Sequence, residues 1–214
     1  METTRNKIKG WVKVLPFYLF TPLPLFTSCK EEDDTIEEYP NWQATNDAYF
    51  NALVAETQAR IAGGDTQWAL IPGYSKPDKG YTYAPTDYIV VQKLESSANT
   101  TSPIGQDTVE VHYVGKLLPS ANKYKEDGYE FERTFSGVYD PDIATPTKLA
   151  LNSSTLVGFV TALLHMHRDD HWRVFIPYQL GYNTSANGSI PAYSTLIFDL
   201  RLQDFWQKEE GDRK

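Results

Sequence analysis

Three histidines and two aspartates lie within one short stretch of this sequence, and these are side chains that bind metals. The histidines are His165, His167 and His171, and Asp169 and Asp170 lie among them. If one helix ran through the stretch, His167 and His171 would share a face and could hold a metal. The charged run between them is also typical of a turn that leaves a helix. We favour the turn and expect no metal site.

A second set of residues could line a pocket for a small ligand or a peptide, because such sites are mostly apolar and aromatic. The set comprises Tyr113, Phe131, Phe159, Tyr182, Ile190 and Phe198. Taken singly, each of these side chains is typical of a core. The sequence has no G-x-S-x-G, phosphate-loop or G-x-G-x-x-G motif. The aromatic set therefore remains a candidate binding site beside the core interpretation, and no cofactor is expected.

The elements that position these residues are mainly strands. Alternating or β-branched patterns predict strands over 88–91, 108–118, 129–135, 148–151, 172–176 and 195–205. One segment, 155–166, is apolar at helical spacing nearly all round, which indicates a buried helix, with Ser153 or Ser154 as its cap. Several strands with one late buried helix predict an α+β fold, an antiparallel sheet wrapped over a helix.

An earlier helix is predicted over 46–62, capped by Asn46 or Asp47 and ended by Gly63. Its apolar face comprises Phe50, Leu53, Val54 and Ile61. This face needs a partner, either the main domain or a second copy of the chain. We favour the main domain, because only one such helix is available. Residues 64–86, rich in glycine, proline, tyrosine and serine, are expected to form an irregular connection.

The first 28 residues differ from the rest. Four basic residues precede a short apolar stretch, 14–26, which is too short to span a membrane and is typical of a secretory signal. Phe26-Thr27-Ser28-Cys29 resembles the lipobox of bacterial lipoproteins, in which the cysteine is acylated. The following Lys30–Asp34 run resembles a surface-export signal of Bacteroidetes lipoproteins. We therefore expect Cys29 to carry lipid, and the alternative is an ordinary signal peptide with a free thiol.

Composition excludes several classes of protein. The chain has 214 residues, enough for one or two domains, and is 41% hydrophobic and 14% aromatic, which rules out wholesale disorder. A single cysteine cannot form an intramolecular disulfide. Removing residues 1–28 leaves 16 basic and 27 acidic residues, a net charge of −11. A chain this acidic, without a basic cluster, is not expected to bind nucleic acid.

Five segments, in order, resemble FKBP-type peptidyl-prolyl cis-trans isomerases. They are Val111–Gly115, Glu130–Glu132, Leu156–Met166, Ile176–Tyr182 and Ile190–Leu200. The resemblance covers about residues 87–206. It implies the FKBP-like fold, an antiparallel sheet half-wrapped around one short helix, and isomerisation of X–Pro bonds. It also implies proline-containing polypeptides as clients and macrolides as ligands.

The resemblance assigns a role to each matched residue. Phe159 is the floor of the proline pocket, where the family usually has tryptophan. Tyr113, Phe131 and Phe198 are its walls. Leu156 presents its backbone N–H to a substrate carbonyl, and Tyr182 donates its hydroxyl to the substrate backbone. Ile190 closes the loop side.

Three features depart from the family pattern. Glu132 stands where the family has aspartate, Thr147 stands where an aromatic residue is expected, and the loop 183–189 is short.

From the resemblance and the N-terminal segment, the leading hypothesis is a lipid-anchored isomerase of the bacterial envelope, in the outer membrane. The alternative is a catalytically weak binding or assembly module of an outer-membrane complex. The predicted divisions are a lipoprotein signal peptide (1–28), an acidic tether (29–45), a helix and irregular connection (46–86), an FKBP-like domain (87–207) and a polar tail (208–214).

Overall fold

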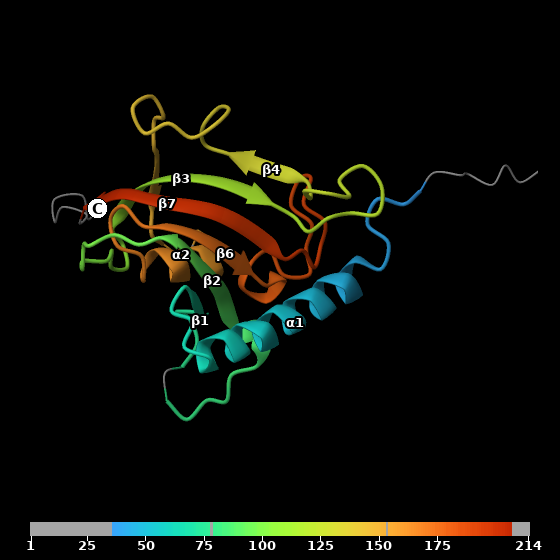
Figure 1. Ribbon diagram of the computed structural model, residues 1–214. Helices are drawn as coiled ribbons and strands as arrows, with labels where there is room; N and C mark the ends of the chain where they lie inside the picture. The colour runs from blue at the N-terminus through green and yellow to red at the C-terminus, as the bar shows by residue number, and fades with distance from the viewer. Residues whose placement is uncertain (1–35, 78, 153, 207–214) are drawn as a thin grey trace, which may run out of the picture. The chain divides into compact units, whose positions relative to one another are not determined.

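A seven-stranded antiparallel sheet forms the framework of the computed structural model, which describes residues 36–206 apart from 78 and 153. Its strands are β1 (Trp68–Pro72), β2 (Tyr88–Glu95), β3 (Thr108–Lys116), β4 (Glu130–Arg133), β5 (Thr147–Ala150), β6 (His171–Ile176) and β7 (Leu196–Trp206). The order across the sheet is β1-β2-β6-β7-β3-β4, and β5 also pairs with β3 (Figure 1). With one short helix on the sheet, this confirms the predicted α+β, FKBP-like class.

Alternation along the strands gives the sheet two different faces. The inner face carries Val91 and Val111 together with Val174 and Leu200, and it packs against α2 (Val157–Leu163). Six of the seven α2 residues, all except Val157, are buried, as predicted for an apolar helix. The predicted serine cap is wrong: Leu156 occupies the cap position without a side-chain hydrogen bond.

The first helix, α1 (Trp42–Ala62), packs on the outer face of the same sheet. Phe50, Leu53 and Val54 of α1 cluster with Val90 and Phe175, so the prediction that this helix packs on the main domain is confirmed. Gly63 ends the helix, as expected.

Three details of the α1 prediction are wrong. The helix begins at Trp42, four residues before the predicted start, and its cap position is Asn41. Asn46 is a buried internal residue whose side-chain oxygen accepts from the distant Thr195 N–H. Ile61 is 42% exposed and does not belong to the buried face.

The segment predicted as an irregular connection contains strand β1. Trp68 to Pro72 pair with Gln92 to Tyr88, so this segment forms one edge of the sheet. Residues 36–206 belong to a single compact unit. In the part of the chain that the structure describes, no helix has the length and apolar character needed to cross a membrane.

A segment after β4 covers part of the outer face. His112, on β3, points outward but is only 1% exposed, because Phe135 and Tyr139 stack against its ring. Its Nε2 lies 2.7 Å from the Gln203 side-chain oxygen. Residues that follow β4 thus cover His112, which the period-two pattern placed in solvent.

Candidate functional site

Four aromatic rings from four different elements meet on the inner face. Phe198 of β7 is central, with its ring centroid 4.9 Å from that of Phe159 on α2, 5.7 Å from Tyr113 on β3 and 5.6 Å from Phe131 on β4. The interplanar angles of 72–85° are the edge-to-face geometry that aromatic pairs prefer. The structure therefore brings together the floor and walls of the predicted pocket.

Two glycines allow this cluster to form. A Cβ at Gly115 would lie 2.5 Å from the Phe131 ring and 3.0 Å from Phe198, so only a glycine lets these rings cross β3. A Cβ at Gly158 would lie 2.3 Å from the Ile176 side chain, so α2 approaches β6 closely at this turn. That approach sets the depth at which Phe159 enters the cluster.

The loop between β6 and β7 supplies the other predicted contacts. Ile190 is buried and packs against the same core cluster, and Tyr182 is half-buried beside it. The backbone of Asn183, which follows Tyr182, is left-handed at φ 58°. Among the described residues, the Tyr182 hydroxyl has no hydrogen-bond partner, which leaves it available to a ligand.

The backbone N–H of Leu156 is also available. Leu156 is half-buried at the start of α2, and its carbonyl accepts the first helical hydrogen bond, from Val160 N–H at 3.0 Å. Its own N–H donates to no backbone carbonyl in the residues that the structure describes. Unsatisfied N–H groups at a helix start can bind a carbonyl oxygen.

Tyr113 and Glu132 form the polar edge of the cluster. Tyr113 is 6% exposed, and its pKa is raised, first by burial and then by the hydrogen bond of its hydroxyl to the exposed Glu132 carboxylate. Nearby Tyr182 raises the same pKa further. The phenol therefore stays protonated and acts as a hydrogen-bond donor.

The described histidines do not converge on a shared site. The helix ends at Leu163, so His167 and His171 do not lie on one helical face. The His165 ring contacts the Thr161 carbonyl at 2.8 Å, whereas the His171 ring lies on the outer face between Glu95 and Asp199. Asp169 is left-handed at φ 71°, which confirms that this stretch is a turn.

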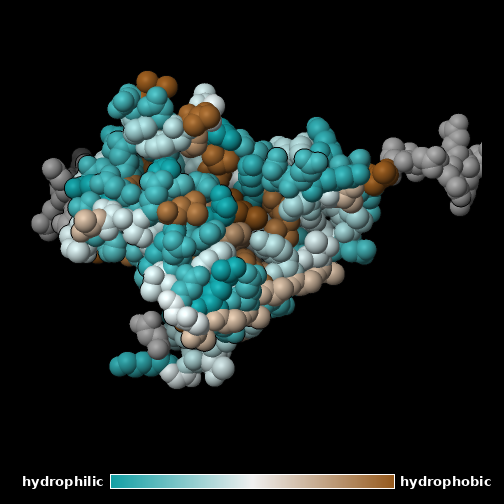
Figure 2. Space-filling model, in the orientation of Figure 1, coloured by the Kyte–Doolittle hydropathy of each residue, from teal (hydrophilic) through white to brown (hydrophobic). Residues whose placement is uncertain are grey.

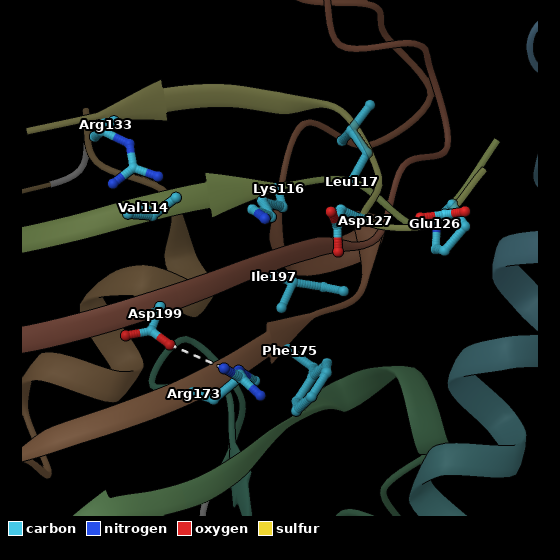
Figure 3. Close-up of a pocket in the computed structure, with 11 residues that line it drawn as sticks. Val114, Lys116, Leu117, Glu126, Asp127, Arg133, Arg173, Phe175, Ile197 and Asp199 are labelled. Atoms are coloured by element: carbon cyan, nitrogen blue, oxygen red, sulfur yellow. Dashed lines mark hydrogen bonds and ion pairs between the residues drawn. The ribbon is translucent and has the colours of Figure 1, made fainter. Parts of the chain in front are cut away.

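Sequence reasoning missed a cavity of about 500 Å³ on the opposite, outer face of the sheet (Figure 3). Its floor is Val114, Ile197 and Phe175, and an ion pair of 3.1 Å joins Arg173 to Asp199 at one side. Figure 2 shows apolar surface in a recess of this face above α1. The sequence signal for this cavity was the apolar character of Phe175 and Ile197, which occupy outward-facing positions of their strands.

Comparison with known proteins agrees with this site. Residues 99–203 match the sequence profile of the FKBP-type peptidyl-prolyl cis-trans isomerase family. A macrophage infectivity potentiator of Trypanosoma cruzi is 34% identical over 115 residues, 53% of this chain and 51% of that protein. An FKBP-type 22 kDa peptidyl-prolyl cis-trans isomerase of Escherichia coli is 33% identical over 103 residues, 47% of this chain and 42% of that protein. The chain thus spans about half the length, or less, of these relatives.

The solved structure of FkpA from Escherichia coli aligns over 78% of this chain and 65% of its own, with 23% identity and a TM-score of 0.46. Cys29 lies outside the described residues, whereas all the residues of the predicted pocket lie inside the matched range. The chain therefore contains a domain of the FKBP-type peptidyl-prolyl cis-trans isomerase family.

Proposed function

We propose that this chain catalyses cis–trans isomerisation of X–Pro bonds in polypeptide clients, at the aromatic cluster of the inner face. The observation that carries the proposal is the meeting of Tyr113, Phe131, Phe159 and Phe198 inside the range that matches the family. The half-buried Phe131, Leu156 and Tyr182 surround the exposed side of this cluster.

The chemistry needs no nucleophile, acid, metal or cofactor. Rotation about the X–Pro bond breaks amide resonance, and the barrier is about 18–20 kcal/mol. Uncatalysed exchange therefore takes tens to hundreds of seconds. The twisted amide loses its charge separation and is less polar than either planar isomer. A dry aromatic pocket binds the twisted form more tightly than the planar forms, which lowers the barrier.

The polar groups of the site fix the backbone around the proline. Leu156 N–H donates to a substrate carbonyl, and the Tyr182 hydroxyl donates to the backbone on the other side. Tyr113 stays protonated beside Glu132, so it adds no negative charge that would favour the planar, polar amide. Phe159 forms the floor and Ile190 closes the loop side.

A second candidate is a binding module with weak turnover, as part of an outer-membrane complex. Its support is the closed packing of the rings, with Phe159 and Phe198 only 4% and 3% exposed. Glu132, Thr147 and the short 183–189 loop, which depart from the family pattern, support it too. Proline-containing segments and macrolides remain the expected ligands of such a module.

We further propose that the chain acts in the bacterial cell envelope, held by lipid on Cys29. The support is the single cysteine directly after an apolar stretch and before an acidic run. Two or more acyl chains give stable anchoring. The domain would then meet secreted clients, whose folding proline isomerisation can limit.

The test is a protease-free isomerisation assay of the full chain on a Leu-Pro or Phe-Pro peptide. We expect faster cis-to-trans relaxation, lost in a Tyr182→Phe/Phe159→Ala double variant and kept in Tyr74→Phe, which alters a tyrosine outside the cluster. Equal rates for parent and double variant would show that the pocket is wrongly assigned. Macrolide binding without acceleration would favour the binding module instead.

A further inference from the structure

Two buried hydrogen bonds join the first helix to the loop that closes the candidate site. The Trp42 indole N–H donates to Ser194 Oγ at 2.8 Å, and Thr195 N–H donates to Asn46 Oδ1 at 2.7 Å. The partners are 152 and 149 residues apart in sequence. The Asn46 side chain also donates to the Trp42 carbonyl at 2.7 Å, so the two contacts support each other.

The hydrogen bonds of Ser194 connect α1 to the residue that follows Ile190. Ser194 Oγ accepts from Trp42 and donates to the Pro191 carbonyl at 2.7 Å, and Pro191 follows Ile190. A fixed hydroxyl therefore links the helix to the residue next to the pocket wall. Hydrogen bonds like these are more costly to lose when the groups are buried, because no water replaces the partner.

The backbone directly before the two anchored residues is strained. Tyr193 has φ 63°, a left-handed conformation that bulky residues rarely adopt. Such residues persist where the surrounding structure holds them. Here Ser194 and Thr195 on one side are bonded to α1, and Tyr193 N–H donates to the Asn183 carbonyl at 3.1 Å.

Tyr178 lies on the other side of the loop and is close to α1. Its pKa is raised by burial and then by the nearby Asp47 carboxylate of α1, and its ring packs on Tyr193 with centroids 5.3 Å apart. Asn183 N–H donates to the Tyr178 carbonyl at 2.7 Å, directly after Tyr182. The first turns of α1 thus bond the C-terminal end of the segment that carries Tyr182 and Ile190, and they lie near its N-terminal end.

We infer that Trp42 and Asn46 are positioning residues of the isomerase site, which hold the strained 190–195 loop so that Ile190 closes the proline pocket. Both residues lie outside the matched range 99–203, so the site would depend on a helix outside the part of the chain that matches the family. The inference rests on the proposed function and adds a determinant of substrate binding to it.

The test compares variants of the full chain by KM and kcat, at a temperature where circular dichroism shows each one folded. Asn46→Ala and Trp42→Phe should each lower kcat/KM about tenfold, mainly through KM, since each removes a buried hydrogen bond. The matched control is Val54→Ala, which removes packing from the same helix in the outer cluster, away from the loop. It should change kcat/KM less than about twofold while it lowers stability.

A double variant separates positioning from general destabilisation. Tyr193→Gly relieves the left-handed strain, because glycine adopts this conformation freely. The effect of Asn46→Ala on KM should therefore be smaller in the Tyr193→Gly background, a non-additivity that independent sites do not show. Full additivity, or an Asn46→Ala variant as active as Val54→Ala, overturns the inference while leaving the function intact. A parent chain without activity overturns both.

Discussion

Gly115 illustrates how one missing side chain shapes the candidate site. Its position on β3 is where the Phe131 ring crosses the strand, at a distance that leaves no space for a Cβ. The sequence shows Gly115 only as the end of a family-like motif. The structure gives the physical reason, which is the close approach of two rings from β4 and β7.

Gly115→Ala should displace Phe131 from the pocket wall. We expect kcat/KM for X–Pro isomerisation to fall about tenfold, with a smaller loss of stability, because Phe131 is half-buried and can rotate outward. The comparison is Gly105→Ala, at a glycine where a Cβ meets nothing within 4 Å. If both variants keep parental activity, Phe131 does not act as a wall.

Asp87 makes stability depend on pH. Burial alone would raise the pKa of this carboxyl, but the Lys76 ammonium at 2.5 Å, the Ala84 N–H and the Tyr81 hydroxyl outweigh burial and lower it. A lowered folded-state pKa adds stability above the unfolded value of about 3.9, and this stability is lost as pH falls through the folded value.

Asp87→Asn should therefore destabilise the chain at pH 7 and flatten the acid side of its stability profile. Urea unfolding at pH 7 and at about pH 3 would measure the free energy of unfolding at both ends. Parallel acid profiles for variant and parent would contradict this account. Asp65→Asn, near Arg60 on a more exposed surface, is the matched control.

At the scale of elements, the close contact of α2 with β6 depends on Gly158. Gly158→Ala would place a Cβ 2.3 Å from the Ile176 side chain, so the helix must move away from the sheet. Overpacking of this kind costs about 1–3 kcal/mol. Chemical denaturation should show this loss, and macrolide or peptide binding should weaken as Phe159 moves with the helix. A variant as stable as Gly105→Ala would show that α2 can shift freely.

Periodicity predicted the elements well where one face is buried and the other is not. β3, β6 and β7 carry apolar residues at every second position, β2 begins with aromatic and β-branched residues, and α2 is apolar nearly all round, so each follows from local pattern. β1 was missed because it is five residues long and flanked by glycine, proline and serine. Its strand conformation depends on pairing with β2.

The errors at α1 have the same kind of origin. Asn46 reads as a cap in sequence because its side chain favours helix starts. In the fold it bonds Thr195, which is 149 residues away and invisible to a local pattern. The pocket residues, by contrast, were assigned through the family resemblance, and the structure brings their rings together. Those roles stay predictions until variants are assayed.

At the scale of the whole molecule, the charge of the chain and the lipid proposed on Cys29 would make opposite contributions to membrane binding. The chain after residue 28 carries a net charge of −11, which repels anionic lipid surfaces. We expect the wild-type chain, expressed in a lipoprotein-processing bacterium, to fractionate with membranes even at about 1 M salt, where charge is screened. Cys29→Ser should release it or leave it unprocessed.

Metabolic labelling with a radioactive fatty acid is the direct measurement. Label on the wild-type chain and none on Cys29→Ser supports the lipid anchor. Label on neither would reduce Cys29 to a leftover thiol, and release of the wild-type chain by salt would point to charge instead. Ser28→Ala serves as the control, since it retains a small residue before the cysteine.

The bonds between α1 and the loop before β7 also have a consequence for synthesis. A chain is made from its N-terminus, so α1 exists before its partners near residue 195. Until then the side chains of Trp42 and Asn46, both buried in the finished fold, lack their hydrogen-bond partners Ser194 and Thr195. A product truncated before β7 would present this apolar helix to chaperones and proteases. Exposure of α1 would therefore mark chains that lack their C-terminal strand for chaperones or proteases.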